Sequence, residues 1–316
     1  MSSSPFPISP ELAARWGGLA GARGDAFLAR LGMRLYAGGA DPVHPVSVIP
    51  AAVVAELIAD LGLADDTDAA VLALAAASAL ARPPISSYRV GVVGIGAASG
   101  DLYLGGNLEF PGASIWHTVH AEGSAALLAR ARGDRLGVLA SPQARPCAHC
   151  RQVLAEFEGA FEMRLIDPLG HDLRLGDVVP WPFAPGDLGQ GGATADEGDA
   201  PALQEPQALP DGVAEAIAAA GRRAHAPYSG SRAAIVLRLG DGTLVGGAVL
   251  ESVAFNPTVG PLQDALVGLV AAGRRYDEIA GAWLAVRRGA PVNHEAPTRD
   301  LLAAVAAVPL QTTYWE

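Results

Sequence analysis

Hydrophobic residues follow a helical spacing through the first eighty residues of the chain. Residues 11–31 and 51–80 place Ala, Leu and Val at intervals of three and four, and Pro50 stands where a helix can begin. We therefore expect a helical N-terminal extension over residues 1–48, and a further helical stretch that leads into the next unit.

A different pattern starts near residue 82, where short runs of β-forming residues alternate with helical segments. Two runs that flank the turn Ser99-Gly-Asp101 predict a β-hairpin over about residues 88–106. The elements expected next are a helix at 120–132, a strand at 136–140, a helix at 148–157 and a strand at 163–167. This alternation predicts an α/β domain with helices layered on a sheet, and we assign it to residues 49–184.

The pattern then repeats. Residues 185–209 are rich in Gly and Pro and have no periodicity, as expected of a linker, and residues 210–316 echo the first unit at an offset of about 140 residues. Glu251 follows a Gly-Gly pair as Glu109 does, and Gln263 then falls near the place of Glu122. We interpret this as one fold used twice; two unrelated α/β units with similar hairpins are the alternative.

Composition and net charge argue against several classes of protein. The 316 residues suit two domains, and 50% hydrophobic with 17% charged residues excludes a disordered chain. The net charge of −11 argues against nucleic acid as a partner, because such binding depends on Lys and Arg neutralising phosphates. The first ten residues do not resemble a signal peptide, and no apolar run is long enough for a membrane span, so we expect a cytoplasmic protein without membrane contact.

The strongest chemical signal is His120-Ala-Glu122, followed by the two cysteines of the chain, Cys147 and Cys150. One imidazole and two thiolates supply three zinc ligands and leave a fourth position for water, which Glu122 is placed to deprotonate. A Cys-x-x-Cys pair alone also suits a redox pair or half of a structural zinc site. A structural site needs a fourth protein ligand, for which the sequence offers no candidate.

His-x-Glu with a downstream Pro-Cys-x-x-Cys is the known signature of zinc-dependent nucleobase deaminases. The segments Gly106-Asn-Leu-Glu-Phe110 and Pro146-Cys-Ala-His-Cys150 resemble cytidine deaminase of the two-domain, homodimeric bacterial type, as do Ala226-Pro-Tyr-Ser229 and residues 251–263 in the second unit. The resemblance implies a duplicated three-layer α/β/α fold and hydrolysis of cytidine or 2′-deoxycytidine to the uridine product with release of ammonia. It also implies one zinc ion per chain.

Carried over position by position, the resemblance assigns a role to each motif residue. His120, Cys147 and Cys150 bind zinc, and Glu122 is the proton shuttle. The substrate contacts are Asn107 and Glu109 on the ribose hydroxyls, Leu108 between them and Tyr88 on the pyrimidine ring. Taken without the resemblance, Tyr88 is equally a core aromatic, Asn107 a turn residue and Glu109 a solvated carboxylate. Ala148 replaces the usual Gly between the cysteines, and the hairpin turn has one extra residue.

The second unit has Pro261-Leu-Gln263 where the first has His-Ala-Glu, and it contains no cysteine. We therefore expect it to be catalytically empty and, by the resemblance, to close the partner subunit's active site in a homodimer with the loop near Phe255. His117 is expected to make a hydrogen bond in the turn before the helix, and His149 to point away from the metal. The competing hypotheses are a deaminase for another aminopyrimidine nucleoside or for a base within nucleic acid, and a non-catalytic zinc-stabilised binding protein.

Overall fold

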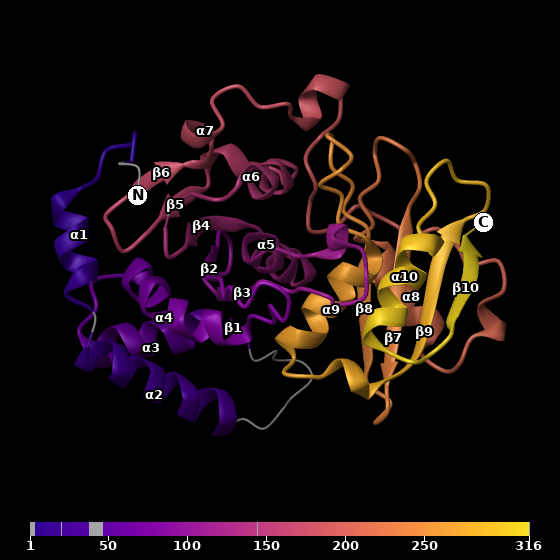
Figure 1. Cartoon of the computed structure of the whole chain (residues 1–316), viewed down its shortest axis with the longest axis horizontal. Helices are drawn as coiled ribbons and strands as arrows, with labels where there is room; N and C mark the ends of the chain where they lie inside the picture. The colour runs from indigo at the N-terminus through magenta and orange to yellow at the C-terminus, as the bar shows by residue number, and fades with distance from the viewer. Residues whose placement is uncertain (1–3, 20, 38–46, 144, 316) are drawn as a thin grey trace.

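The computed structural model describes residues 4–19, 21–37, 47–143 and 145–315. Two α/β units lie side by side, with the N-terminal helices on the outer side of the first unit and the last strand on the far side of the second (Figure 1). The predicted α/β fold class is confirmed.

The first unit is built on a six-stranded sheet in the order β1-β3-β2-β4-β5-β6. The strands are β1 (Val48–Ile49), β2 (Gly91–Gly96), β3 (Leu102–Gly106), β4 (Leu136–Ala140), β5 (Arg164–Ile166) and β6 (Asp172–Arg174). β2 and β3 pair antiparallel across the predicted turn, so the hairpin is confirmed. β4 and β5 run parallel, and the register of β2 shifts at Ile95/Gly96.

Helices cover both faces of this sheet. Successive residues along its strands point to opposite faces, and each face has its own hydrophobic core. Val92 and Tyr103 share a core with α5 (Ala121–Ala131), whereas Val93 and Leu104 share another with α4 (Asp66–Leu80). The remaining helices of this half of the chain are α1 (Pro10–Gly17), α2 (Ala22–Ala37), α3 (Ala51–Leu61), α6 (Ala148–Ala155) and α7 (Leu175–Val178). The N-terminal extension packs on the α4 side through the buried Trp16 and Phe27.

The expected continuous helical pattern over residues 51–80 proves to be two helices. α3 ends at Gly62, which adopts the left-handed conformation that glycine tolerates best, and Asp65 caps α4 by accepting the N–H groups of Thr67 and Asp68. The extension is likewise two helices, α1 and α2, and its residues 38–46 lie outside the described part of the chain.

The second unit repeats the architecture in a four-stranded sheet of order β10-β9-β7-β8. Its elements are α8 (Val213–Gly221), β7 (Ala233–Leu239), β8 (Leu244–Ala248), α9 (Pro261–Ala271), β9 (Ile279–Arg287), α10 (Glu295–Val305) and β10 (Leu310–Trp315). β7–β10 match β2–β5 in order and direction, including the parallel last pair and a register shift at Arg238/Leu239. The duplicated fold is therefore confirmed.

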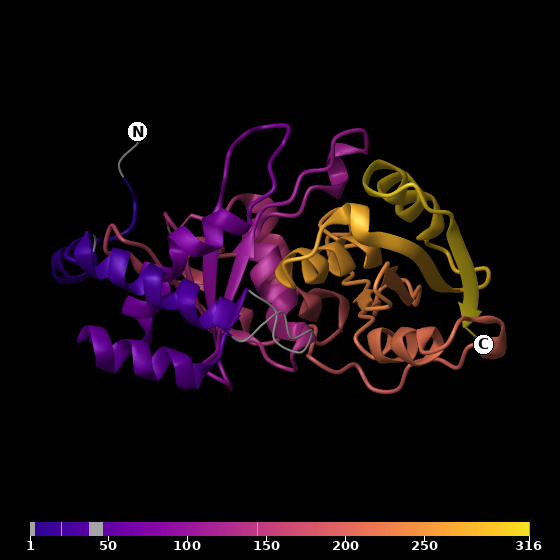
Figure 2. The ribbon, with the colours of Figure 1, turned by 90° about the horizontal axis from the view of Figure 1, so that it is seen from below.

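The two units meet through their equivalent helices. α5 and α9 pack against each other (Figure 1, Figure 2), and a single hydrophobic core continues from one unit into the other. The connecting segment touches both units, since Ala193 pairs with Phe157 and Leu203 pairs with Trp315. This packing fixes how the second unit faces the helix that carries His120 and Glu122.

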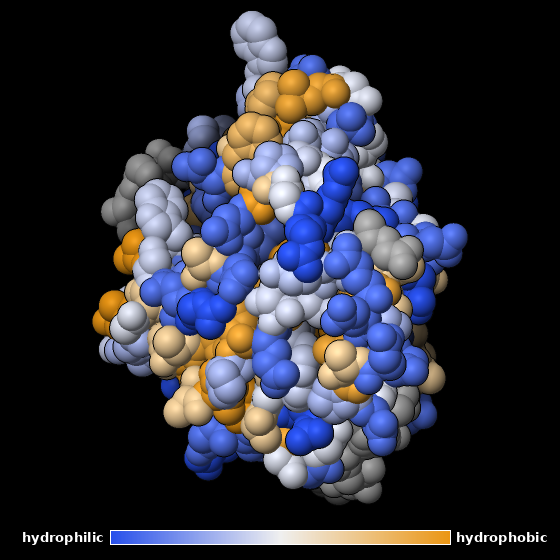
Figure 3. All heavy atoms as spheres, turned by 90° about the vertical axis from the view of Figure 1, so that its right-hand side faces the viewer, coloured by the Kyte–Doolittle hydropathy of each residue, from blue (hydrophilic) through white to orange (hydrophobic). Residues whose placement is uncertain are grey.

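The outer face of the second unit is dominated by hydrophilic residues, with hydrophobic ones in separate groups (Figure 3). Among the helices that the structure describes, none has both the length and the apolar character needed to cross a bilayer.

Candidate metal centre and active site

Two helix N-termini bring the three predicted metal ligands together. His120 is the N-cap residue of α5, Cys147 is the N-cap residue of α6, and Cys150 lies in the first turn of α6. His120 Nδ1 is 3.1 Å from Cys150 Sγ and 3.5 Å from Cys147 Sγ, and the two sulfurs are 3.4 Å apart. The three donor atoms therefore form one compact triangle.

This triangle fits a zinc ion. Tetrahedral zinc with Zn–S near 2.3 Å and Zn–N near 2.0 Å places its ligand atoms roughly 3.5–3.8 Å apart, within a few tenths of an ångström of the observed spacings. The donor set of one imidazole and two sulfurs suits zinc. Three protein ligands leave a fourth position for water or substrate, as catalytic zinc sites do.

The two sulfurs differ in their readiness to ionise. The side chain of Cys150 and, at 3.5 Å, its backbone N–H both point at Cys147 Sγ, and they lower the pKa of Cys147 to about 4 against the opposing effect of burial. The neighbouring Cys147 sulfur, burial and the Glu122 carboxylate raise the pKa of Cys150. Cys147 is thus the more acidic of the two thiols.

Glu122 lies beside the predicted metal ligands. Its residue is only 9% exposed in the first turn of α5, and its carboxylate interacts with the Cys150 side chain. A carboxylate next to the open side of a metal triangle can receive a proton from water and pass it on. The structure therefore brings Glu122 and the three ligands into one site.

Asn107 and Glu109 lie at the end of β3 and hold the loop that carries Tyr88. Asn107 accepts the N–H of Val90 and donates to the Tyr88 carbonyl. Glu109 accepts the N–H groups of Ile85 and Ser86, at 2.9 and 2.8 Å, and the Ser86 hydroxyl. Burial opposes ionisation of Glu109, but these hydrogen bonds hold its pKa below its usual range.

Taken without the family resemblance, Glu109 was expected to be a solvated carboxylate and Tyr88 a core aromatic. The structure shows neither. Glu109 is buried rather than solvated, and Tyr88 is 72% exposed rather than part of the core. Leu108, in contrast, has the environment of a core residue. Its side chain is 2% exposed in the core, and its backbone N–H and C=O both pair with Val119.

His117 makes the hydrogen bond expected of it, with Nε2 3.0 Å from Asp300 Oδ2. The expectation for His149 is wrong. One of its ring nitrogens lies within 4.8 Å of the ligand atoms of His120 and Cys150, and its ring is 5.4 Å from that of His120. Its position between the two cysteines on the first turn of α6 gave no sign of the side-chain direction.

The second unit has no metal ligands at the equivalent place. Gly260 is the N-cap residue of α9 as His120 is of α5, so Leu262 rather than Gln263 occupies the position of Glu122. Gln263 accepts the N–H of Gly260 and donates to the backbone carbonyl of His117 in the first unit. The expected placement of Gln263 is therefore off by one residue, and its amide joins the two units.

The loop after β8 reaches the metal site of its own chain. Pro257 and Thr258 line a hollow of about 20 Å³ together with His120 and His149. Phe255 in the same loop has a positive φ of 59° and is 58% exposed. The side chain expected to face a partner subunit is thus available on the surface.

Sequence reasoning missed Glu156 at the end of α6. Its carboxylate, 0% exposed, accepts the Tyr228 hydroxyl at 2.6 Å and the Val253 N–H at 2.8 Å, and lies 2.9 Å from His225 Nε2. Tyr228 lies in the turn of the second unit that corresponds to the loop held by Glu109 in the first. The Glu156 carboxylate therefore reaches from the first unit into that part of the second. The sequence gives no signal for it, because its partners lie 69 or more residues away.

Comparison with protein families identifies two matches along the chain. Family models described as "Cytidine and deoxycytidylate deaminase zinc-binding region" match residues 65–162 and residues 175–299. Together they cover more than half of the chain and fall on the two structural units.

Solved structures of bacterial cytidine deaminases are similar to about a third of the chain. The enzyme from Mycobacterium tuberculosis is 31% identical over 34% of this chain and 89% of its own length, with a TM-score of 0.31. The Mycobacterium leprae enzyme is 28% identical over 37% and 99%, with a TM-score of 0.33. The Burkholderia pseudomallei enzyme is 26% identical over 32% and 82%, with a TM-score of 0.28. The family relationship rests on the sequence matches, since TM-scores of this size carry no argument about fold.

Proposed function

Since the chain belongs to the cytidine and deoxycytidylate deaminase family, we propose that it hydrolyses cytidine and 2′-deoxycytidine to uridine and 2′-deoxyuridine with release of ammonia. The observation that carries this proposal is the triangle of His120, Cys147 and Cys150 with the buried Glu122 beside it. Hydrolytic deamination of a nucleobase at a zinc site uses three metal ligands and a glutamate of this kind.

Glu122 is the proposed proton carrier. Zinc, when bound, supplies Lewis acidity that favours deprotonation of water and stabilises negative charge. Glu122 takes the proton of the attacking water and gives it to N3 of the cytosine ring as the water oxygen adds to C4. It then moves a proton to the C4 amine, the C–N bond breaks, and ammonia leaves as the C4 carbonyl forms.

Asn107 and Glu109 are the proposed ribose contacts. Glu109 accepts three hydrogen bonds and a carboxylate offers about four acceptor positions, so one remains for a sugar hydroxyl. The Asn107 amide nitrogen has a second hydrogen beyond the one donated to Tyr88. The exposed Tyr88 ring is free to pack on the pyrimidine.

We propose one zinc ion per chain, held in the first unit. The second unit has Gly260 and Leu262 at the equivalent positions and no cysteine. Within the described residues, the side chains close enough together to hold a metal all lie at this place in the first unit: His120 and Cys150 with Cys147, and His120 and Cys150 with His149. The second unit then serves as a support for α5.

We also propose a cytoplasmic homodimer. Trp116, Tyr88 and Phe255 are 77%, 72% and 58% exposed, and large apolar side chains of this kind are commonly covered by a partner. The loop carrying Phe255 is the segment proposed to cover the partner's site. Both cysteines must stay reduced to bind zinc, which suits the cytoplasm.

The roles of Glu122 and Cys147 can be separated by two substitutions. Glu122→Gln should keep zinc and lower kcat by about 10²–10⁴-fold, because the general acid–base step is removed. Cys147→Ala should lose zinc itself. Zinc content and ultraviolet absorbance of the cytidine reaction measure both effects, and a Glu122→Gln variant with ordinary turnover would exclude the shuttle.

A substrate panel then separates the proposed reaction from its competitors. Cytidine, 2′-deoxycytidine, deoxycytidylate, cytosine and single-stranded DNA are compared at equal concentration. We expect turnover of the two nucleosides, because the chain is acidic and Asn107 and Glu109 suit free sugar hydroxyls. Turnover confined to DNA, or to none of the five compounds, would refute the proposed substrate class.

A further inference from the structure

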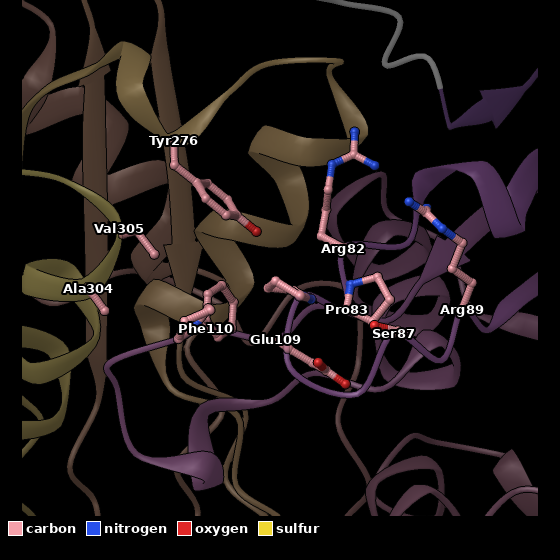
Figure 4. Close-up of a pocket in the computed structure, with 11 residues that line it drawn as sticks. Arg82, Pro83, Ser87, Arg89, Glu109, Phe110, Tyr276, Ala304 and Val305 are labelled. Atoms are coloured by element: carbon pink, nitrogen blue, oxygen red, sulfur yellow. The ribbon is translucent and has the colours of Figure 1, made fainter.

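A cavity of about 450 Å³ lies where the loop of residues 82–89 faces the second unit (Figure 4). Tyr276 and the end of α10 at Val305 form the wall opposite that loop. Neither the three metal ligands nor Glu122 lines the cavity. It is a hollow between the two units that borders the proposed substrate site at one residue, the proposed ribose contact Glu109, and its size is typical of small-molecule sites.

One side of the cavity is apolar and aromatic. The rings of Phe110 and Tyr276 are 6.0 Å apart at an angle of 44°, and Val305 lies beside them. Tyr276 also brings a polar atom, because its buried hydroxyl has no hydrogen-bond partner in the described part of the chain. Burial raises the pKa of Tyr276 to about 12, so this hydroxyl is a donor at neutral pH.

Two arginines form the other side. Nη1 of Arg82 and Nη1 of Arg89 donate to backbone carbonyls at the end of α4, where both bond the carbonyl of Ala81. Neither arginine forms an ion pair within the described residues, although the chain carries a net charge of −11. Two guanidinium groups are thus held in place with N–H donors left over.

Glu109 is the acidic residue among those that line the cavity. Its carboxylate points away from Tyr276 (Figure 4) and already accepts hydrogen bonds from Ile85 and Ser86. Glu109 therefore repels an anion near Arg82 less than an unpartnered carboxylate would.

We propose that this cavity binds a small organic anion, with an apolar ring against Phe110 and Val305 and a phosphate or carboxylate group on Arg82, Arg89 and the Tyr276 hydroxyl. Arginine forks match both oxyanions in geometry and charge. The ring fills the apolar wall, and the anion meets the three polar donors that lack acidic partners.

The test is calorimetric titration of the zinc-loaded full-length protein with phenyl phosphate, benzoate and uncharged benzyl alcohol. Three variants probe the site: Arg89→Gln removes a cation, Tyr276→Phe removes the free hydroxyl, and Ala304→Trp fills the cavity. Arg238→Gln is the charge-matched control, because Arg238 is exposed on β7 above the Trp283 ring and does not line the cavity.

Phenyl phosphate should bind the parent protein and Arg238→Gln equally, and about tenfold more weakly to Arg89→Gln and Ala304→Trp. Tyr276→Phe should weaken binding by a smaller factor, and benzyl alcohol should bind more weakly than either anion. The ratio of phenyl phosphate to benzoate affinity identifies the oxyanion. Arg89→Lys, which keeps the charge and loses the fork, should restore part of the affinity.

Equal affinity of phenyl phosphate for the parent, Arg89→Gln and Ala304→Trp would overturn the proposal, as would the absence of binding. If Ala304→Trp does not fold, the affinities of Arg89→Gln and Arg89→Lys for phenyl phosphate test the proposal. Binding is measured without turnover, so the result does not depend on whether the protein deaminates cytidine.

Discussion

Glu109 and Glu251 hold the same turn in the two units. Glu251 accepts the N–H groups of Tyr228 and Ser229 as Glu109 accepts those of Ile85 and Ser86. In both units the serine hydroxyl accepts the backbone N–H two residues on, from Tyr88 to Ser86 and from Ser231 to Ser229, and in the first unit the Ser86 hydroxyl also donates to the carboxylate. A carboxylate thus holds the turn in both units, and in the first unit that carboxylate accepts one further hydrogen bond, from the Ser86 hydroxyl.

This difference predicts the effect of removing one hydroxyl. Ser86→Ala should raise KM for cytidine by roughly threefold to tenfold with a smaller change in kcat, because it loosens Glu109 without touching Glu122. Losing this donor also raises the pKa of Glu109 toward its ordinary value. As the pH is lowered, the KM of the variant should therefore begin to rise at a higher pH than the KM of the parent.

Steady-state kinetics across pH checks this prediction, with Ser229→Ala as the matched control in the second unit. The assignment of Glu109 to the substrate contacts would be contradicted if both serine variants kept the parent KM at every pH.

Glycines let α5, the helix that begins at His120, approach the sheet. A Cβ atom on Gly105 in β3 would lie 2.2 Å from the carbonyl oxygen of Ala121, and one on Gly247 in β8 would lie 2.3 Å from that of Pro261. These are backbone atoms in the first turns of α5 and α9, so neither can move without moving the helix. Close approach places His120 and Glu122 at a fixed height above the sheet.

Gly105→Ala should therefore displace the start of α5. We expect a loss of about 1–3 kcal/mol in the free energy of unfolding, the usual cost of overpacking, together with weaker zinc binding. Gly123→Ala is the control on the same helix, because its Cβ would meet neighbours at 3.9 Å or more and alanine favours a helix.

Denaturant unfolding and zinc titration of the two glycine variants provide the measurement. Normal stability and zinc affinity in Gly105→Ala would show that the spacing of helix and sheet does not control the site.

Elements with a local pattern could be predicted from the sequence. The hairpin around Gly100, the strand at 136–140 and the helix that stops before Gly133 all depend on neighbouring residues. The three predicted metal ligands could be proposed from the sequence because they stand at two helix starts, and the structure brings their side chains together. The break at Gly62 was missed because the hydrophobic spacing continues through it, although Gly62 and Asp65 are ordinary helix-end signals.

Features that arise from packing could not be predicted. A one-residue difference in helix register decides that Leu262, and not Gln263, replaces Glu122. The side-chain direction of His149, the partners of Glu156 and the cavity lined by Arg82 depend on elements that are distant along the chain.

The two units are joined by a buried cluster of polar groups. Glu156 lies between His225, Tyr228 and the backbone of Val253, and Glu197 of the connecting segment lies 3.1 Å from His225 Nδ1. Burial opposes the charged form of His225, but the two carboxylates outweigh it and raise its pKa. Hydrogen bonds lower the pKa of Glu197 to about 2 against the effect of burial.

The raised pKa of His225 has a definite consequence for stability. The contribution of charged His225 is fully present below its unfolded pKa of about 6.5 and is lost as pH rises through the higher folded value. The parent should therefore become easier to unfold as pH rises above about 7. His225→Gln should lower stability by about 3–5 kcal/mol below that pH, because a buried carboxylate loses its partner, and should flatten the profile above it.

Urea unfolding between about pH 6 and 9 measures this profile. Tyr228→Phe is the control, since it removes one hydrogen bond to the same carboxylate and should lower stability without changing the slope. A slope that is equal in the parent and in His225→Gln would exclude this cluster as the source of the pH dependence.

The most direct test of the whole account is the zinc X-ray absorption spectrum of the purified, active protein. One imidazole and two thiolates, with a remaining oxygen ligand, predict a shell of two sulfur atoms near 2.3 Å and two nitrogen or oxygen atoms at roughly 2.0–2.1 Å. A shell without sulfur, a shell of four sulfurs, or an active protein with no zinc would contradict it.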